Sequence, residues 1–501
     1  MAQSEKMVYT VTPTSTTTKE DNCEDPPWKF WKKRRYVVAL LAFFGFFNAY
    51  ALRVNLSIAI VAMTEFKNVT LENQTVITSR EFDWSTKTQG YLLSSFFYGY
   101  ITTQLAGGYL ASRIGGKRIF CLGIGVTAAL TLITPFIAAN VTLFLIVRIV
   151  EGIFEGVTYP CMHAVWGKWA PPLERSRLAT IAFSGSYFGT VVSMPLCSYL
   201  AASLGWPSIF YCFGTVGLIW CVIWTIVVKD SPHEDPKISE SELRYITECL
   251  KDTDTNKPAK IPWKSFVTSM PVWAITVSHF SENWGFYTLL TQLPKYMKNV
   301  LNFELKDTGF MSALPYLAMC IMTQFSGQFA DWFLVKGILN TTQVRKVFNC
   351  SAFIAQTVFM MAAAYWLSPV GTTFCLTMAV GLGAFAWAGF SINHLDIAPQ
   401  YAGILMGFGN TFATLPGIVS PILTGYMVTD ETNVVEWRIV FYVSSGIYLV
   451  GAVFYGTFAS GELQPWAVET VPLKSYDSRR RNDEPPSYVN KSFQQSDEAY
   501  S

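Results

Sequence analysis

The sequence predicts an all-α membrane protein with twelve transmembrane helices in two six-helix halves. Three observations lead to this fold class: the composition, the number of long apolar segments, and an internal repeat. Of the 501 residues, 51% are hydrophobic and only 14% are charged, and the mean hydropathy is +0.29. A soluble chain of this length has a larger share of charged residues, so lipid must cover much of this surface.

The apolar segments are long enough to be transmembrane helices. A helix needs about 20 mostly apolar residues to cross a bilayer, and runs of this length exclude transmembrane strands. The chain contains twelve of them, at approximately 36–63, 88–111, 119–139, 142–166, 178–201, 208–228, 272–293, 308–330, 347–367, 372–393, 402–428 and 439–460.

The positive charges predict the orientation of the helices. Lysine and arginine gather before the first span and after the second, fourth and eighth, whereas the connections after the third, fifth and ninth have neither. Cytoplasmic loops carry this excess, so both termini are predicted to be cytoplasmic. The loop 64–87 then faces the lumen or exterior, and it carries two glycosylation sequons, at Asn68 and Asn73.

An internal repeat divides the chain. The string GYLLSSFFYGYITTQLAGG begins at Gly90, and its counterpart GFMSALPYLAMCIMTQFSG begins 219 positions later, at Gly309. Parallel six-helix halves with a binding site between them are the plan of major facilitator transporters. The predicted regions are a tail (1–35), the first half (36–228), a cytoplasmic central loop (229–268), the second half (269–460) and a disordered cytoplasmic tail (461–501). In the central loop, Ser239 and Glu242 have the spacing of a helix-capping box.

The fourth span carries three charges in the string RIVEGIFEGVTYP: Arg148, Glu151 and Glu155. Residues seven apart lie about 20° from each other around a helix and roughly 10 Å apart along it, so Arg148 and Glu155 share one face. A charge at the bilayer centre costs at least ~3 kcal/mol. The stripe therefore predicts a water-filled cavity, the alternative being an internal salt-bridge stripe that only stabilises packing.

Arg53 lies deep in the first span, in YALRVNLS, close to Tyr50. A guanidinium is always charged and its planar fork matches a carboxylate. With no acid in its own span, its expected partner is a substrate anion or one of the two glutamates of the fourth span. Snorkelling to the headgroups is the alternative, although Arg53 is far from the start of its span.

Polar residues also occur in the second half. The seventh span contains His279, Glu282 and Tyr287, of which the histidine and glutamate can exchange protons; an ordinary polar contact is the favoured interpretation of His279. His394 and Asp396 fall near the cytoplasmic end of the tenth span, where a gating contact is expected.

The segments after the two repeated strings resemble the major facilitator loop signature. The first reads GYLASRIGGKR, with serine where the acid is usual, and the second reads GQFAD, which keeps the acid as Asp331. The basic cluster in the first segment also serves simply as a topology determinant.

Several strings resemble solute carrier family 17, the organic-anion and vesicular-glutamate branch of the major facilitators. These strings are YALRVNLS, GSYFGTV, EGVTYP, KWAPPLERSR, NHLDIAP and YAGILMG, and the likeness extends over roughly 36–466. Others, such as RIVEGIFEGV and HFSENWGFYTLL, are most similar to the sialin type, which exports sialic acid from lysosomes with protons.

The resemblance implies roles for particular residues. It implies that Arg53 binds a substrate carboxylate, that Arg148 shapes the site and that Glu155 couples proton uptake, with Glu151 as a second acid. Tyr50, Tyr98 and Tyr287 are expected to line the pocket. Where this chain has Glu282, vesicular glutamate transporters have arginine and sialin has tyrosine, and an acid there should repel a second carboxylate.

The resulting hypothesis is an alternating-access symporter that moves a sialate-like organic anion or an acidic amino acid out of a lysosome or vesicle. The expected coupling ion is the proton, with no cofactor, and the protein is expected to function as a monomer. A sodium-dependent phosphate or urate carrier at the plasma membrane is an alternative, as is a vesicular glutamate-type transporter. A non-transporting scaffold is a third, because the tail string PPSY, ending at Tyr488, resembles a ligand for WW domains. No nucleophile, phosphate-binding or metal-binding pattern suggests an enzyme.

Overall fold

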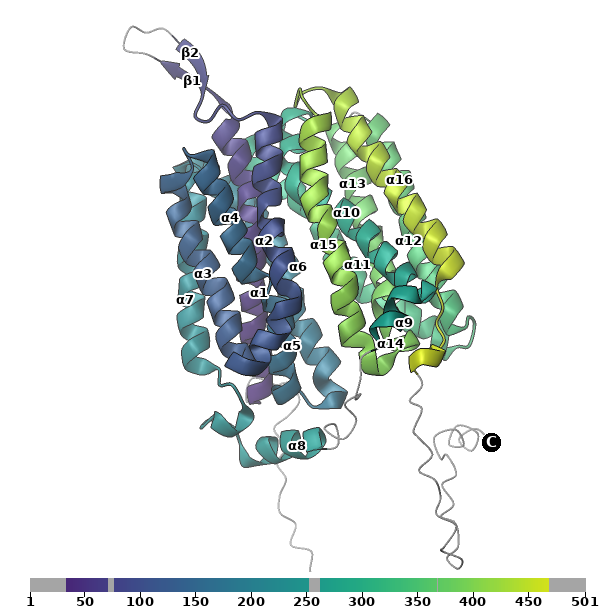
Figure 1. Cartoon of the computed structure of the whole chain (residues 1–501). Coiled ribbons are helices and arrows are strands. Elements are labelled where there is room, and N and C mark those ends of the chain that lie inside the picture. Colours follow the sequence, from purple (N-terminus) through teal and green to yellow (C-terminus); the bar gives the residue numbers. More distant parts are fainter. Residues whose placement is uncertain (1–32, 71–75, 252–261, 367, 468–501) are drawn as a thin grey trace, which may run out of the picture.

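The computed structural model describes residues 33–70, 76–251, 262–366 and 368–467. Their helices form one bundle, with a β-hairpin at one end and the short helix α8 at the other (Figure 1). Twelve helical spans build the bundle, as the sequence predicts.

The first six spans consist of seven helices, because the fourth span is broken into two. They are α1 (Arg34–Thr64), α2 (Thr86–Ile114), α3 (Gly116–Ile137), α4 (Val141–Glu155), α5 (Thr158–Trp169), α6 (Pro172–Leu204) and α7 (Pro207–Val227).

The last six spans also contain one interrupted helix, the tenth span. They are α10 (Met270–Asn299), α11 (Leu305–Val335), α12 (Thr341–Tyr365), α13 (Pro369–Ala386) with the π-helical turn η4 (Trp387–Ser391) and α14 (Ile392–Ile397), α15 (Ala402–Met427) and α16 (Val434–Phe458). Short helical turns lie between and after the spans: η2 (Pro232–Glu234), α8 (Glu240–Lys251), α9 (Trp263–Thr268), η5 (Pro399–Tyr401) and η6 (Pro465–Ala467).

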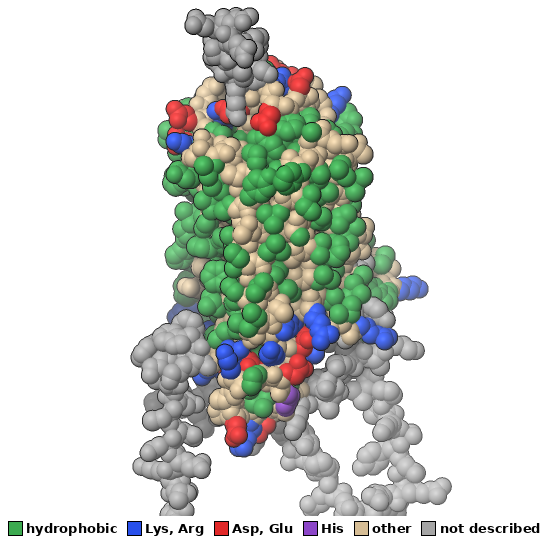
Figure 2. All heavy atoms as spheres, turned by 90° about the vertical axis from the view of Figure 1, so that its left-hand side faces the viewer, with side chains coloured by type: hydrophobic (Ala, Val, Ile, Leu, Met, Phe, Trp, Pro, Cys, Tyr) green, Lys and Arg blue, Asp and Glu red, His purple; other side chains and the backbone are tan. Residues whose placement is uncertain are grey.

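The surface of the bundle matches a bilayer. Hydrophobic side chains form a broad belt, and charged side chains gather at its two ends (Figure 2). Within the described residues, eight helical segments are long and apolar enough to cross a membrane by length and composition alone. The other four spans are α2, α4 with α5, α10 and α11, of which α4 and α5 are each too short because the helix breaks between them.

The break between α4 and α5 positions the end of α4. Gly156 lies so close to α2 that a Cβ on it would be 2.5 Å from the carbonyl oxygen of Tyr100. The Thr158 hydroxyl donates to the carbonyl of Glu155 at 2.7 Å, which satisfies an acceptor that the broken helix leaves open. Glu155 is therefore the last residue of α4, at a kink pressed against α2.

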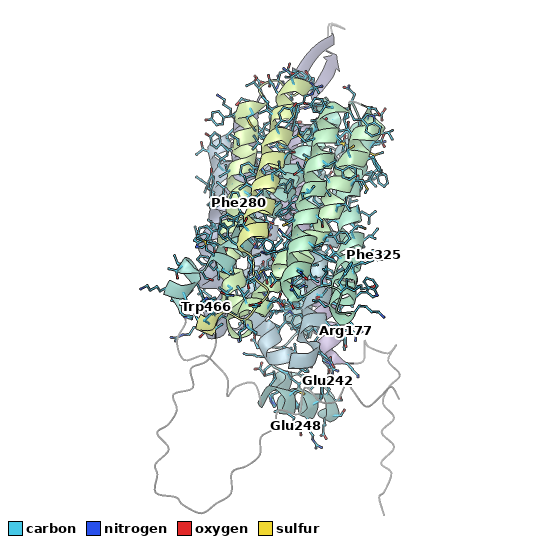
Figure 3. The ribbon with its side chains drawn as sticks, turned by 90° about the vertical axis from the view of Figure 1, so that its right-hand side faces the viewer. Arg177, Glu242, Glu248, Phe280, Phe325 and Trp466 are labelled. Atoms are coloured by element: carbon cyan, nitrogen blue, oxygen red, sulfur yellow. The ribbon has the colours of Figure 1, made fainter. Side chains whose placement is uncertain are left out.

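The loop after α1 contains the only strands among the described residues. β1 (Phe66–Thr70) pairs antiparallel with β2 (Val76–Arg80), with Asn68 opposite Thr78. The opposite end of the bundle carries α8, whose Glu242 and Glu248 lie below the spans (Figure 3).

The expected capping box of α8 forms only in part. The amide of Glu242 donates to the Ser239 hydroxyl at 3.3 Å. The Glu242 carboxylate accepts instead from the backbone amide of Arg34 at 2.9 Å and pairs with the side chain of Arg35 at 3.0 Å. The first turn of a transmembrane helix has free amides and attracts carboxylates, so Glu242 ties α8 to the start of α1.

The two groups of spans meet mainly toward the hairpin end. Lys298 of α10 pairs with Glu65 at 2.7 Å. Glu431 accepts from Gln89 of α2 at 3.0 Å and from Asn299 of α10 at 2.6 Å. Farther down the bundle, Gln104 of α2 accepts from Asn410 of α15 at 2.6 Å.

Toward the α8 end the two groups separate. No heavy atom lies within 4 Å of a Cβ placed on Gly327, Gly403 or Gly407, apart from atoms of their own helices and chain neighbours. These positions of α11 and α15 are therefore not packed against the first six spans. Among the described residues, the hydrogen bonds and ion pairs that join the two groups therefore lie toward the hairpin end and the middle of the bundle.

Candidate functional site

Arg53 and Glu155 form a buried ion pair between α1 and the end of α4. Arg53 is 6% exposed and Glu155 is fully buried. The Arg53 Nε atom donates to Glu155 Oε1 at 3.0 Å, and Nη2 makes a second contact with the same oxygen. Arg53 Nη1 and Glu155 Oε2 have no partner among the described residues. Of the two glutamates that the sequence left open as partners of Arg53, Glu155 is the one that pairs with it.

Arg148 and Glu151 form a second buried ion pair, within α4. Arg148 Nη1 donates to Glu151 Oε2 at 2.7 Å, one helical turn away. The Thr131 hydroxyl of α3 donates to the other carboxylate oxygen at 3.1 Å, so Glu151 has both oxygens engaged. Arg148 Nε has no partner among the described residues.

These two pairs show how the buried charges of the fourth span are partnered. Arg148 and Glu155 share a face of the fourth span, but the ion pairs join Arg148 to Glu151 and Glu155 to Arg53. Protonation of Glu155 would therefore release Arg53 and not Arg148, because it is Arg53 that Glu155 neutralises. Helical periodicity alone could not reveal this, since Arg53 comes from another helix.

Aromatic rings surround the Arg53 guanidinium. Its central carbon lies 4.5 Å from the ring centre of Tyr50, 4.7 Å from that of Tyr100 and 4.9 Å from that of Phe96. Phe96 also lies 5.4 Å from the guanidinium of Arg148. Rings at these distances attract a cation through their negative faces, so Tyr50, Phe96 and Tyr100 stabilise Arg53, and Phe96 also stabilises Arg148.

A cavity opens beside the two arginines, where the two groups of spans meet. In this conformation its free volume is about 10 Å³, roughly the room for one water molecule, and α10 contributes to it from the second group of spans. Its lining consists of Arg53, Val54, Ser57, Leu93, Phe96, Phe97, Arg148, Leu290 and Thr291. Two guanidinium groups with unused N–H donors therefore face one cavity, which is an arrangement suited to a carboxylate.

The predicted tyrosines differ in their positions. Tyr50 contacts Arg53, as described, and Tyr287 of α10 lies within electrostatic range of Tyr50 and Arg53. Like Tyr50 and Tyr287, Tyr98 is not among the residues that line the cavity. It is half-buried and lies near Tyr91, which is exposed at the surface of α2.

Phe96, which lines the cavity, and Tyr100 both contact Arg53, and the sequence reasoning missed both. Tyr98 points about 200° away from either of them around the helix. Tyr91 and Tyr98 are seven residues apart and share the outer face of α2, so the helical period could have separated the two sets.

Glu282 of α10 is buried in the second half at 2% exposure. Its Oε1 atom accepts from the Gln356 amide of α12 at 3.4 Å, and its Oε2 atom has no partner among the described residues.

The two histidines lie near each other at the junction of α10, α14 and α15. His279 is 1% exposed and packs on the rings of Trp387 and Phe390. A Cβ on Gly409 would be 3.8 Å from His279 Nδ1 and 3.9 Å from His394 Nε2. His394 Nδ1 lies 2.9 Å from the Ser391 carbonyl oxygen. Neither histidine lines the cavity.

Asp396 is held by an arginine of its own half. It pairs with Arg345 of α12 through Nε at 2.7 Å and Nη2 at 3.3 Å. The same guanidinium donates to the Ala388 carbonyl oxygen at 3.0 Å. This carbonyl belongs to the π-helical turn, so Arg345 joins the interrupted tenth span to α12.

Some predicted residues cannot be placed. Asn73 and Tyr488 lie outside the described residues, and the side chains of Asn68 and Asp331 are likewise outside the described part of the chain.

Comparisons with known proteins place this chain in a family. The model for the Major Facilitator Superfamily matches residues 36–421. Human sialin is 45% identical over 456 residues, which cover 87% of this chain and 91% of that protein. Vesicular glutamate transporter 1 of Xenopus laevis is 44% identical over 443 residues, covering 87% of this chain and 77% of that protein.

Solved structures share the fold at low sequence identity. A bacterial homologue of the human lysosomal transporter Spinster, in an inward-facing and unoccupied conformation, has a TM-score of 0.68 at 14% identity and covers 86% of this chain and 99% of its own. A D-xylose–proton symporter has a TM-score of 0.65 at 16% identity, with coverage of 86% and 99%. The chain therefore belongs to the major facilitator superfamily and, within it, to solute carrier family 17 with sialin and the vesicular glutamate transporters, and it is a multi-pass membrane transporter and not an enzyme.

Proposed function

We propose that this transporter carries a small organic anion with one carboxylate, together with protons, out of an acidic compartment. The observation that carries the proposal is the cavity in which Arg53 and Arg148 each retain a guanidinium N–H without a partner. A carboxylate has two oxygens that accept such donors in parallel. The names of the relatives, sialin and vesicular glutamate transporter, agree with an anionic substrate.

The coupling step is a competition for Arg53. With Glu155 ionised, Arg53 is neutralised by it, and a substrate carboxylate gains little from binding there. When Glu155 takes up a proton, the guanidinium is left without a counter-charge in a buried site, which is costly. A substrate carboxylate then replaces the lost charge, so proton and anion bind together.

Release follows from the same competition. The alternating-access motion of the two halves opens the α8 end. The site is then exposed to a less acidic solution. Glu155 loses its proton there, pairs with Arg53 again and displaces the carboxylate. Tyr50 and Tyr287 lie beside Arg53 in this scheme and shape the space that the substrate occupies, while Arg148 and Glu151 remain paired.

The orientation and location belong to the same proposal. The hairpin end would face the lumen, and the α8 end, with both termini, would face the cytoplasm. The sequons at Asn68 and Asn73 and the cytoplasmic excess of lysine and arginine support this orientation. The names and sequence similarity of the relatives support a lysosomal or vesicular membrane.

Uptake by proteoliposomes containing the purified full chain tests the substrate and the coupling ion. The panel is sialate, aspartate, glutamate, urate and phosphate, each at two pH values on the donor side and with sodium or choline as the main cation. We expect uptake of a carboxylate that rises when the donor side is acidic and is indifferent to sodium. Arg53→Ala should abolish it, whereas Arg244→Ala, a control at an exposed side chain of α8, should not. Sodium-dependent uptake of phosphate or urate, or no uptake of any carboxylate, would contradict the proposal.

A further inference from the structure

Two threonines of α3 contact Glu151, the acid of the fourth span that pairs with Arg148. Thr131 is 1% exposed and Glu151 is fully buried, and the Thr131 hydroxyl oxygen lies 3.1 Å from Glu151 Oε1. One turn earlier, the Thr127 hydroxyl oxygen lies 3.3 Å from the backbone carbonyl oxygen of Glu151. The neighbouring helix therefore contacts both the side chain and the backbone of this residue.

The Thr131 hydroxyl carries one hydrogen but has two acceptors within reach. The second acceptor is the Thr127 carbonyl oxygen of its own helix, at 2.8 Å. Hydrogen bonds to a carboxylate are roughly twice as strong as neutral ones, so the hydrogen points to Glu151 while Glu151 is ionised. If Glu151 were protonated, only the weaker bond to Thr127 would remain for this hydrogen. The hydroxyl therefore favours the ionised form of Glu151.

Through Glu151, the hydroxyl acts on a residue of the cavity. Arg148 donates to Oε2, the carboxylate oxygen that Thr131 does not contact, at 2.7 Å. Arg148 lines the cavity, whereas Thr131 and Glu151 do not. An ionised Glu151 neutralises Arg148, and a buried guanidinium without a counter-charge is costly. The state of Glu151 therefore decides whether Arg148 is available to a second anion.

Other charged groups leave this arrangement to Thr131 and Arg148. Among the described residues, Arg148 is the one base that pairs with Glu151, and Glu155, one turn later in α4, pairs with Arg53 of α1. The helices α2 and α3, which pack on α4, contain no acid, and their bases lie in the first or last turn. These bases are Lys87, Arg113, Lys117 and Arg118.

We propose that Thr131 is a positioning residue for proton coupling: its hydroxyl keeps Glu151 ionised and paired with Arg148, so that Glu155 alone exchanges a proton during transport. The inference rests on the proposed function and deepens it, because it separates the roles of the two acids of the fourth span. Without the hydroxyl, Glu151 takes up a proton more readily, and Arg148 then becomes a second group that binds a carboxylate.

The test removes Glu155 as a proton acceptor and asks whether Glu151 takes its place. Thr131→Val, which replaces the hydroxyl by a methyl group, is added to a Glu155→Gln background. Thr131→Ser, which keeps the hydroxyl, is one control. Thr134→Val is the other, because the buried Thr134 hydroxyl bonds to the Leu130 carbonyl of its own helix at 3.1 Å. Dissociation constants for sialate, aspartate and glutamate are measured by calorimetry on the purified full chain, from mildly acidic to neutral pH.

Glu155→Gln alone should bind the carboxylate with the same affinity at every pH, because Glu151 stays ionised. Adding Thr131→Val should tighten binding at the acidic end by at least about tenfold, because hydrogen bonds to charged groups are strong and Arg148 becomes available. Adding Thr131→Ser or Thr134→Val should leave the affinity of the background unchanged. Adding Glu151→Gln should give the tight binding at every pH, which identifies Glu151 as the group that titrates.

Three results would overturn the inference while leaving carboxylate binding intact. The first is equal or weaker binding at every pH when Thr131→Val is added, and the second is the same gain with Thr134→Val. The third is an affinity that depends on pH in Glu155→Gln itself, since Glu151 would then titrate with Thr131 in place. If Thr131→Val does not fold, Thr131→Ala removes the same hydroxyl and the same outcomes apply. If the wild type neither binds nor takes up any of the three anions, the proposed function itself fails.

Discussion

At the scale of single residues, the aromatic rings around Arg53 stabilise its positive charge. A guanidinium has five N–H donors, and if acids occupied all of them no donor would remain for a substrate. Tyr50, Phe96 and Tyr100 stabilise the charge through their ring faces instead. Arg53 therefore keeps Nη1 available.

Two tyrosines two residues apart provide a matched test of this geometry. Tyr100→Ala removes one ring from Arg53, and we expect uptake to fall about tenfold because a desolvated cation–π contact contributes roughly 1–2 kcal/mol. Tyr98→Ala changes a half-buried side chain away from the cavity and should reduce uptake less than about twofold. Uptake is measured in proteoliposomes at equal protein content. Equal losses in the two variants would refute the placement of the rings.

The sequence identifies the costly charges but not their pairing. Arg53, Arg148, Glu151 and Glu155 stand out because charge is rare in apolar spans. Their partners depend on how α1 is rotated and where α4 ends, and both are set by tertiary packing. The role of Tyr98 in the pocket stays a prediction, and the residue lies on a different face of α2 from Phe96 and Tyr100.

At the scale of elements, the close contact of α2 and α4 positions the arginine site. Gly99 and Gly152 face each other's helices, and a Cβ on either would collide with a backbone carbonyl, that of Ile149 or Phe96 respectively. Small residues allow membrane helices to approach in this way. The contact brings Phe96 of α2 beside Arg148 of α4.

A pair of glycine variants tests the importance of that contact. Gly152→Ala should force α2 and α4 apart and lower stability by about 1–3 kcal/mol, visible as a lower melting temperature of the purified protein. Gly167→Ala in α5 is the control, because nothing outside its own helix and chain neighbours lies within 4 Å of the added Cβ. A melting temperature for Gly152→Ala that equals the control would show that the helices are not in close contact.

The interruptions of the fourth and tenth spans illustrate what hydropathy cannot predict. Hydropathy shows that both segments cross the membrane, and the predicted ranges agree with the helices to within a few residues. It does not show that the fourth span breaks after Glu155, or that a π-helical turn offers the Ala388 carbonyl to Arg345. Both features depend on neighbouring helices that approach closely or supply a hydrogen-bond partner.

At the scale of the whole molecule, the two halves are held together at the hairpin end. Tyr91 of α2 and Tyr426 of α15 exemplify this, since their hydroxyl oxygens are 2.9 Å apart and their ring centres are 6.4 Å apart. Both side chains are exposed. Alternating access requires this contact to separate in every cycle.

Cross-linking tests whether the contact opens during transport. In the double variant Tyr91→Cys and Tyr426→Cys, a short bis-methanethiosulfonate reagent should join the two helices and stop uptake, and reduction should restore it. The single-cysteine variants, treated identically, control for reaction with the native cysteines. Uptake that continues after complete cross-linking would show that the halves do not separate here.

The twelve-span architecture was predictable from the sequence because its signals are repeated along the chain. Apolar length, alternating positive charge and the 219-residue repeat each act over many residues. The conformation was not predictable, because closure at one end depends on a few contacts between distant segments, such as Lys298 with Glu65.

The central claim is that Glu155 and the substrate carboxylate compete for Arg53, and Glu155→Gln tests it most directly. Two assays are compared in proteoliposomes: uptake driven by a proton gradient, and exchange of labelled for unlabelled substrate at equal pH on both sides. The competition predicts that the variant loses gradient-driven uptake but retains exchange, because glutamine leaves Arg53 available to the carboxylate at any pH. Gradient-driven uptake equal to that of the wild type would contradict the claim.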